Sequence, residues 1–269
     1  AGVYSGVDTQ TMSIPGALIG MNSYQYRVVI GSVACPSVTS TASVLTVNPL
    51  LSASVSIGAS PSTTICDGTS VTFTATPVNG GGSPSYQWYL NGSTAGTNSP
   101  TYVNATLANA DEVYVEMTSN AVCPTPGMST SNTLTMTVNP ILPVSVTIST
   151  PILTVCDGST VIFSATPVNE GLTPTHEWFI NGNPVGTNSP TYSTTTLVDG
   201  DVVTHTLTSS ETCISGSPAN SNSLTMDVQF PGTWLGYTSD WNTISNWGCG
   251  ILPLSTTDVT IPTVPEGGI

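Results

Sequence analysis

The stretch TTICDGTSVTFTATPVNGG at residues 63–81 returns as LTVCDGSTVIFSATPVNEG at residues 153–171. The offset of 90 residues holds without a gap from about residue 61 to residue 138, and it relates Trp88 to Trp178. Self-similarity at a fixed period indicates repeated structural units. The chain therefore contains two copies of one module of about ninety residues.

Within each copy, apolar residues alternate with polar ones at a period of two, as in Val71, Phe73 and Ala75. Turn-forming stretches such as NGGGSP and NADE separate these runs, as short antiparallel strands require. No helical stripe of any length occurs. About six or seven strands per module, with Trp88 on the third, predict an immunoglobulin-like β-sandwich. The expected fold class is all-β, with tandem Ig-like sandwiches arranged end to end.

We predict four parts in the chain. Residues 1–49 form the C-terminal part of an Ig-like domain, residues 50–140 and 141–229 form two complete ones, and residues 230–269 start a further β domain. The first assignment rests on the cysteine and the closing TVNP that this segment shares with the full modules. The linkers VNPLL and VNPIL are short, and their proline restricts two residues, so neighbouring modules are expected to be held semi-rigidly.

The composition excludes two classes of partner. The 269 residues include one basic residue and fifteen acids, for a formal charge of −14, and only 6% are charged. Phosphate backbones and anionic lipid surfaces are bound by Lys and Arg, so neither nucleic acid nor an anionic lipid surface is expected as a partner. No apolar run reaches the 18 residues or so of a membrane span, so no membrane insertion of this segment is expected. The opening AGVYSGVD suggests a mature or truncated piece of a longer exported protein.

Six cysteines at wide spacings, without a C-x-x-C pair, favour disulfides and an oxidising compartment. Cys66 precedes one predicted strand and Cys123 follows another, so both are expected at one end of the sandwich. We therefore predict the pairs Cys66–Cys123 and Cys156–Cys213, each stabilising its module by about 3–4 kcal/mol. The partners of the two other cysteines are expected in the missing half-module for Cys35 and downstream for Cys249.

No catalytic residue is predicted. The two histidines, His176 and His205, stand where the first copy has Tyr86 and Val115 on apolar faces. They are interpreted as partly buried neutral side chains; the alternative, a two-histidine metal site, lacks a third ligand.

Acidic residues repeat at the turn DGD, where Asp199 and Asp201 could supply oxygen ligands to a calcium ion. The counterpart NAD at residues 109–111 keeps only the last acid, which favours a plain turn. No cofactor is predicted, and calcium is the alternative.

Two further motifs allow a binding role. GTNSPTY occurs at residues 96–102 and again at 186–192; we interpret it as a turn and strand start whose tyrosine packs near the tryptophan. Three tryptophans cluster late in the chain at Trp234, Trp241 and Trp247. Exposed, they would form a platform for stacking on glycans. The favoured interpretation is the opening of another β domain, with TTDVTIP as its first strand.

The motifs C-D-G-[ST]-x-V-x-F-x-A-T-P, W-[YF]-[LI]-N-G and T-N-S-P-T-Y resemble the Ig-like/PKD-like repeats of very large surface proteins of Bacteroidetes. The closing TW-x-G…DWN…NW…TDVTIP is similar to segments near the ends of such proteins. Gliding-motility adhesins, exported by the type IX secretion system, are the best-known members. The resemblance covers essentially the whole chain and implies no catalytic residue.

The resemblance and the composition together predict a non-catalytic stalk or adhesive segment of a secreted or cell-surface adhesin or filament, attached to the outer membrane. Its expected partners are surface glycans, other surface proteins or copies of itself. The alternative is a spacer or carbohydrate-binding region of a secreted polysaccharide-degrading enzyme.

Overall fold

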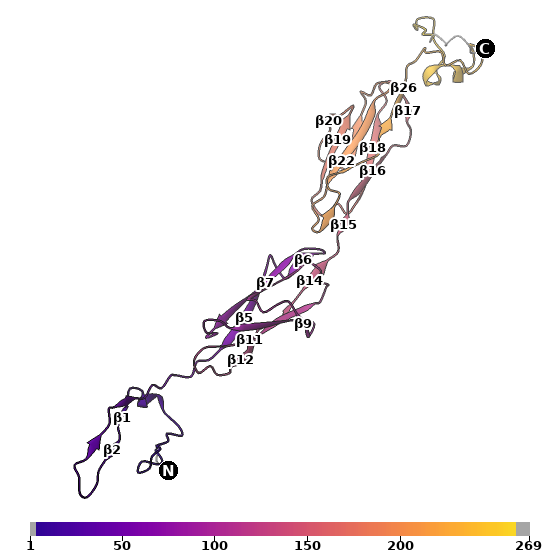
Figure 1. The fold of residues 1–269 in the computed structure, drawn as a ribbon. Helices are drawn as coiled ribbons and strands as arrows, with labels where there is room; N and C mark the ends of the chain where they lie inside the picture. The colour runs from indigo at the N-terminus through magenta and orange to yellow at the C-terminus, as the bar shows by residue number, and fades with distance from the viewer. Residues whose placement is uncertain (1–3, 262–269) are drawn as a thin grey trace. The chain divides into compact units, whose positions relative to one another are not determined.

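The computed structural model describes residues 4–261 (Figure 1). The chain divides into two compact units between Asn139 and Pro140, and each unit is described by itself. The helical elements of the described residues are three short 3₁₀ turns: η1 (Ile19–Met21), η2 (Ile244–Asn246) and η3 (Gly248–Gly250). None of them has the length and apolar character that a membrane-crossing helix needs.

The first sandwich comprises strands β5 to β14. Their bounds are β5 (Ser54–Ser60), β6 (Thr64–Cys66), β7 (Val71–Val78), β8 (Ser85–Leu90), β9 (Ser93–Ala95), β10 (Thr101–Asn104), β11 (Glu112–Thr118), β12 (Met128–Thr130), β13 (Leu134–Thr135) and β14 (Thr137–Asn139). One antiparallel sheet has the order β10-β7-β5, and the other places β8 between β9 and β11, with β12 and β13 pairing β11. The strand β6 pairs in parallel with β14, the last strand of the sandwich.

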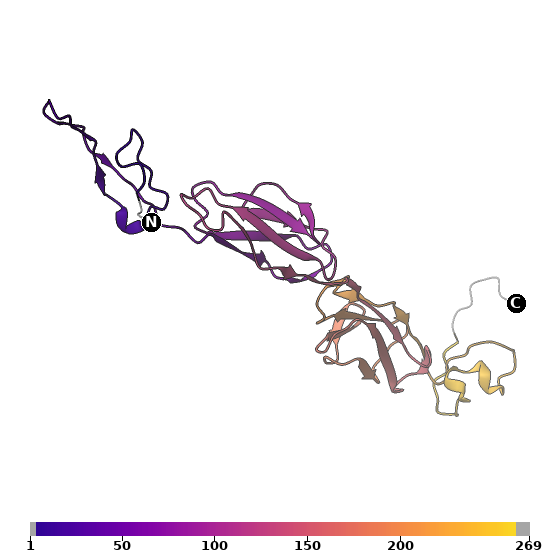
Figure 2. The same cartoon turned by 90° about the horizontal axis from the view of Figure 1, so that it is seen from below.

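The second sandwich repeats this topology. Its strands are β15 (Leu142–Pro143), β16 (Ser145–Ser149), β17 (Thr154–Cys156), β18 (Val161–Val168), β19 (Thr175–Ile180), β20 (Asn183–Val185), β21 (Thr191–Thr194), β22 (Val202–Thr208), β23 (Ile214–Ser215), β24 (Ala219–Asn220), β25 (Leu224–Thr225) and β26 (Asp227–Gln229). The sheets are β16-β18-β21 and β20-β19-β22, with β24 and β25 on β22. As β6 does with β14 in the first sandwich, β17 pairs in parallel with β26, the last strand of the second sandwich. Both views show the two layers in each sandwich (Figures 1 and 2), and the predicted all-β, Ig-like fold class is confirmed.

The core of each sandwich follows from the period of two. In β7 the residues Val71, Phe73 and Ala75 are buried, while their neighbours are wholly or partly exposed. Trp88 of β8 is fully buried, with its ring centroid 6.4 Å from that of Phe73 and 5.9 Å from that of Tyr102. Large aromatic side chains dominate the energetics of such small cores because each removes a large apolar area from water. The same aromatic triad recurs in the second sandwich as Phe163, Trp178 and Tyr192.

The residues before the first sandwich form two small antiparallel pairs. The strand β1 (Gln25–Tyr26) pairs with β4 (Ser43–Val44), and β2 (Val29–Ile30) pairs with β3 (Val38–Thr39). Of the hydrophobic side chains in residues 4–50, only Met21 is buried. This segment therefore has apolar residues on strands without a core of its own.

Residues 230–261, called the C-terminal segment below, contain no strand longer than a single bridge. Thr233 pairs with Thr260 and Trp234 with Trp247 as isolated bridges. The strand expected at TTDVTIP is therefore reduced to one bridged residue, Thr260, in the part of the motif that is described; Pro262 lies outside the described residues. The segment is organised by its tryptophans and by a disulfide.

Candidate functional site

The repeated motif GTNSPTY makes its hydrogen bonds to the strands of its own sandwich. The Asn98 side-chain oxygen accepts a hydrogen bond from the Tyr86 backbone N–H at 2.7 Å, and the Ser99 carbonyl accepts one from the Trp88 indole N–H at 2.9 Å. Gly96 has φ +62°, and a Cβ there would lie 2.9 Å from the Tyr102 ring. The second copy makes the same bonds from Asn188 and Ser189. The motif is a turn that anchors the core tryptophan, as expected for a structural part.

The turn at Asp199 and Asp201 is also satisfied internally. The buried Asp201 carboxylate accepts bonds from the Asn181 side chain at 2.7 Å and from the Val198 N–H at 2.9 Å. Asp199 accepts one from the Val228 N–H at 3.1 Å. Both acids therefore accept hydrogen bonds within the module, which accounts for them as parts of a turn. Within residues 4–261 no cluster of three or more His, Cys, Asp or Glu has the arrangement of a metal site.

The two histidines form a buried pair in the second sandwich. His176 Nδ1 lies 3.1 Å from His205 Nε2, and His176 Nε2 lies 3.6 Å from a Glu170 carboxylate oxygen. His205 is 1% exposed, and its Nδ1 has no hydrogen-bond partner. Burial, with a smaller contribution from the neighbouring His176, lowers the pKa of His205 from 6.5 to about 4. Both rings are thus core side chains, and His205 is neutral at physiological pH.

The predicted disulfide pairs Cys66–Cys123 and Cys156–Cys213 are wrong. Cys123 is a free, exposed thiol, and Cys156 is bonded to Cys249. Cys66 and Cys213 are disulfide-bonded as well.

Strand direction explains why the predicted pairing fails. The chain leaves β7 and β11 at the same end, where the Ser119 hydroxyl donates to the Asn79 carbonyl at 2.7 Å. Cys66 precedes β7, whereas Cys123 follows β11, so the two cysteines lie at opposite ends of the sandwich. A strand of eight residues spans about 26 Å, while bridged cysteines need Cα atoms within about 7 Å.

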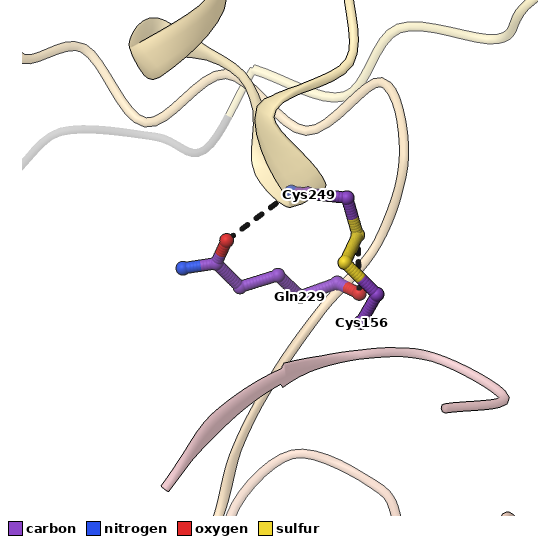
Figure 3. Close-up of a disulfide and its surroundings, with 3 residues drawn as sticks. All are labelled: Cys156, Gln229 and Cys249. Carbon is purple, nitrogen blue, oxygen red and sulfur yellow. Dashed lines mark hydrogen bonds between the residues drawn. A yellow bond between two sulfur atoms is a disulfide. The ribbon is translucent and has the colours of Figure 1, made fainter. Parts of the chain in front are cut away.

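The Cys156–Cys249 disulfide joins the second sandwich to the C-terminal segment (Figure 3). The two Cα atoms are 5.4 Å apart. The Gln229 side-chain oxygen accepts a hydrogen bond from the Cys249 N–H at 3.2 Å, and Gln229 pairs with Cys156 across β26 and β17. Gly248 allows this approach, because a Cβ there would collide with the Phe230 carbonyl oxygen at 2.3 Å. The prediction of a downstream partner for Cys249 is therefore wrong, since its partner lies 93 residues upstream.

The three tryptophans of the C-terminal segment form one cluster. The rings of Trp234 and Trp241 stack with centroids 4.8 Å apart, and Trp247 meets both edge-on at 4.9 and 5.2 Å. Trp247 is 1% exposed, whereas Trp241 is 50% exposed. Trp247 is therefore the core of the segment, and the alternative of a glycan-stacking platform at Trp234, Trp241 and Trp247 would have to use the other two rings. Trp241 keeps an accessible surface, with the exposed Tyr237 in the same segment.

Asn246, which was not among the predicted site residues, organises this cluster. It is fully buried; its amide group donates to the Thr238 hydroxyl at 2.6 Å and to the Asp240 carbonyl at 2.7 Å. Its oxygen accepts a bond from the Thr238 N–H at 2.7 Å. The position of Asn246 directly before Trp247 was the available signal, because a polar residue beside a core tryptophan must find partners.

Comparison with known proteins gives similarity of fold only. No protein-family model and no curated protein matches the chain. Among solved structures, three N-terminal domains of the bacteriophage RB49 outer capsid protein Hoc are 14% identical, with TM-score 0.31 over 67% of this chain and 60% of that one. Murine CEACAM1b is 11% identical with TM-score 0.32, over 65% of this chain and 99% of that one. The four N-terminal Ig domains of Dscam1 isoform 6.9 are 13% identical with TM-score 0.32, over 84% and 60%. The chain thus spans less than two thirds of the phage structure, and the fold assignment rests on the strand pairing described above.

Proposed function

We propose that this chain is a non-catalytic stalk and adhesive segment of a large secreted or cell-surface adhesin or filament. One observation carries the proposal: the polar side chains that recur in both copies are used to build the module. Asn98 and Asn188 cap the same backbone N–H, and Asp111 and Asp201 close the same turn. Selection for a repeated scaffold explains this pattern, whereas a repeated ligand site would leave such groups free.

The disulfides support an extracellular place for the chain, since they persist in oxidising compartments. The Cys156–Cys249 bridge ties a sandwich to the segment that follows it, which suits a chain under tension. The surface is polar with few charges, and it suits hydrogen bonding to glycans or to neighbouring protein chains. The resemblance of the motifs to Bacteroidetes repeats supports an outer-membrane adhesin of the gliding-motility type, exported by the type IX system.

Force spectroscopy tests the stalk role. The 269-residue chain, held at its two ends, is expected to resist extension and to lengthen in sandwich-sized steps of about 0.36 nm per released residue. Reduction with dithiothreitol should lengthen the extension, because residues between Cys156 and Cys249 are otherwise shielded from the pulling force. Smooth extension at the low force of an unfolded chain would contradict a stalk.

A second candidate function, glycan binding, is favoured by the half-exposed Trp241 stacked on Trp234. This would also fit the alternative that the chain is a carbohydrate-binding region of a secreted polysaccharide-degrading enzyme. On a glycan array, Trp241→Ala is expected to abolish binding. Tyr4→Ala, at an exposed aromatic residue in the other unit, serves as the control. Equal binding by the wild type and Trp241→Ala, or none by either, would exclude this role.

A further inference from the structure

Cys123 and Cys213 occupy equivalent positions and have the same local structure. Their φ angles are 58° and 57°. The Cys123 carbonyl accepts a hydrogen bond from the Leu51 N–H at 2.9 Å, and the Cys213 carbonyl accepts one from the Leu142 N–H at 2.7 Å. Cys213 is disulfide-bonded, whereas Cys123 is free and exposed. Cys123 is thus a free thiol in the same local backbone structure in which the equivalent Cys213 forms a disulfide.

The cysteines of the C-D-G motif show what such a bridge joins. Cys66 ends β6 opposite Asn139, and Cys156 ends β17 opposite Gln229, so each lies beside the last strand of its own sandwich. Both are disulfide-bonded, and the partner of Cys156 is Cys249, twenty residues beyond β26. In the second sandwich, the C-D-G cysteine therefore bonds to the part of the chain that follows the sandwich.

The residues before the first sandwich have the backbone hydrogen bonds that, within that sandwich, lie next to the edge strand β14. Ser23 N–H donates to the Leu45 carbonyl, and Leu45 N–H donates to the Tyr24 carbonyl. These bonds match those of Ala110, Met136 and Asp111 in the first sandwich. Ser23 and Ala110 even share a positive φ, 68° and 69°.

The match continues to the strand edge. The Val47 N–H donates to the Asn22 side chain at 2.9 Å, as the Val138 N–H does to the Asn109 side chain at 3.1 Å. By this correspondence Thr46 to Asn48 are equivalent to β14, the edge on which β6 lies in parallel. Exposed Val29, Ile30 and Val44 lie on the neighbouring short strands.

We propose that Cys123 is the attachment point for a further Ig-like module of the same kind. In this arrangement a C-D-G strand of that module pairs in parallel with Thr46–Asn48, and its cysteine forms a disulfide with Cys123. Asn48 precedes Leu51 by the same three residues that separate Asn139 from Leu142. The incoming cysteine, opposite Asn48, therefore lies three residues along the chain from Leu51, whose N–H donates to the Cys123 carbonyl. Both described C-D-G cysteines are already bonded, so the partner thiol is supplied by another segment.

The bond forms by thiol–disulfide exchange with a low-molecular-weight disulfide such as oxidised glutathione. The Cys123 thiolate first attacks this disulfide, releasing one glutathione and leaving a mixed disulfide. The partner thiolate then displaces the second glutathione as the protein S–S bond forms. The two thiols lose two electrons and two protons in total, and the glutathione disulfide is reduced to two thiols.

A peptide with the sequence of residues 62–70, STTICDGTS, can probe this site on the 269-residue chain in a glutathione redox buffer. The control peptide has the same composition in scrambled order, with the cysteine at the same position. Mixed disulfides at Cys123 and at the other free, exposed thiol, Cys35, are quantified by peptide mapping and mass spectrometry. We expect at least a tenfold preference of the probe for Cys123 over Cys35. The probe should also exceed the scrambled peptide at Cys123 by a similar factor.

Two variants separate strand pairing from simple thiol exposure. Thr46→Pro removes the N–H equivalent to that of Thr137, which donates to the Thr63 carbonyl in the first sandwich at 2.8 Å. It should abolish the preference for the probe and leave glutathionylation of Cys123 unchanged. Thr41→Pro, at an exposed position of the same segment, should keep the preference. Equal reaction of probe and scrambled peptide with the wild-type chain, or equal labelling of Cys35 and Cys123, would overturn the proposal.

Discussion

Asn98 shows how a single polar residue of the repeated turn acts on the core. Its side-chain oxygen satisfies the N–H of Tyr86, a residue only 8% exposed. Asn98→Ala leaves that N–H without a partner and is expected to destabilise the first sandwich by about 1–3 kcal/mol. Chemical denaturation followed by core tryptophan fluorescence measures the change.

The neighbouring residue Thr97 provides the matched control. It is exposed, and Thr97→Ala should change the unfolding free energy by less than about 0.5 kcal/mol. Equal losses of unfolding free energy in the two variants would mean that the hydrogen bond to the Tyr86 N–H does not stabilise the sandwich.

His205 makes the stability of the second sandwich depend on pH. Its pKa falls from 6.5 to about 4 in the folded chain, chiefly because it is buried. Above pH 6.5 the ring is neutral in both states, and the stability is full. As the pH falls from 6.5 towards 4, the unfolded chain binds a proton that the folded chain does not, so stability is lost. The loss is on the order of 3 kcal/mol and levels off below pH 4.

The first sandwich supplies the variant that tests this dependence. It has Tyr86 and Val115 where the second has His176 and His205. The double change His176→Tyr with His205→Val should flatten the pH profile of the second sandwich between pH 4 and 6.5 in thermal unfolding. A profile that keeps its slope would assign the dependence to groups other than the two histidines.

At the scale of elements, the strands could be predicted and the disulfides could not. Alternation such as that of Val71, Phe73 and Ala75 is a local signal, and the buried face it predicts is the one observed. Cysteine pairing depends on which end of the sandwich each strand begins at. That is set by the path of the chain between sheets, which the sequence near Cys66 or Cys123 does not encode. The parallel pairing of β6 with β14 is likewise a long-range contact that no local period reveals.

The bridge between β17 and η3 should hold the C-terminal segment in place. This segment has a small core, centred on Trp247 and Asn246, and the bridge closes a loop of 93 residues. A loop of that length contributes about 4–5 kcal/mol in the chain-entropy model. Cys249→Ser is therefore expected to raise amide hydrogen exchange throughout residues 230–261 and to leave the core strands of the second sandwich, such as β19 and β22, protected.

Cys35→Ser, which removes a free exposed thiol, is the control for this experiment and should leave both regions unchanged. Unaltered protection of Trp247 in Cys249→Ser would show that the tryptophan cluster holds the segment without the bridge.

At the scale of the whole molecule, the presence of a single basic residue makes trypsin cleavage a probe of assembly. Arg27 is the single residue after which trypsin can cut, and it lies exposed between β1 and β2. The isolated native chain should therefore be cut once, after Arg27, and it should give no further tryptic fragments when reduced and unfolded in urea. Thermolysin, which needs only apolar residues, should degrade the unfolded chain and serves as the control.

If a module pairs with Thr46–Asn48 and covers the strands around Arg27, chains assembled with that module should lose the tryptic cut while the isolated chain keeps it. Cleavage at equal rates in both states, followed by mass spectrometry, would mean that this segment stays uncovered in the assembly.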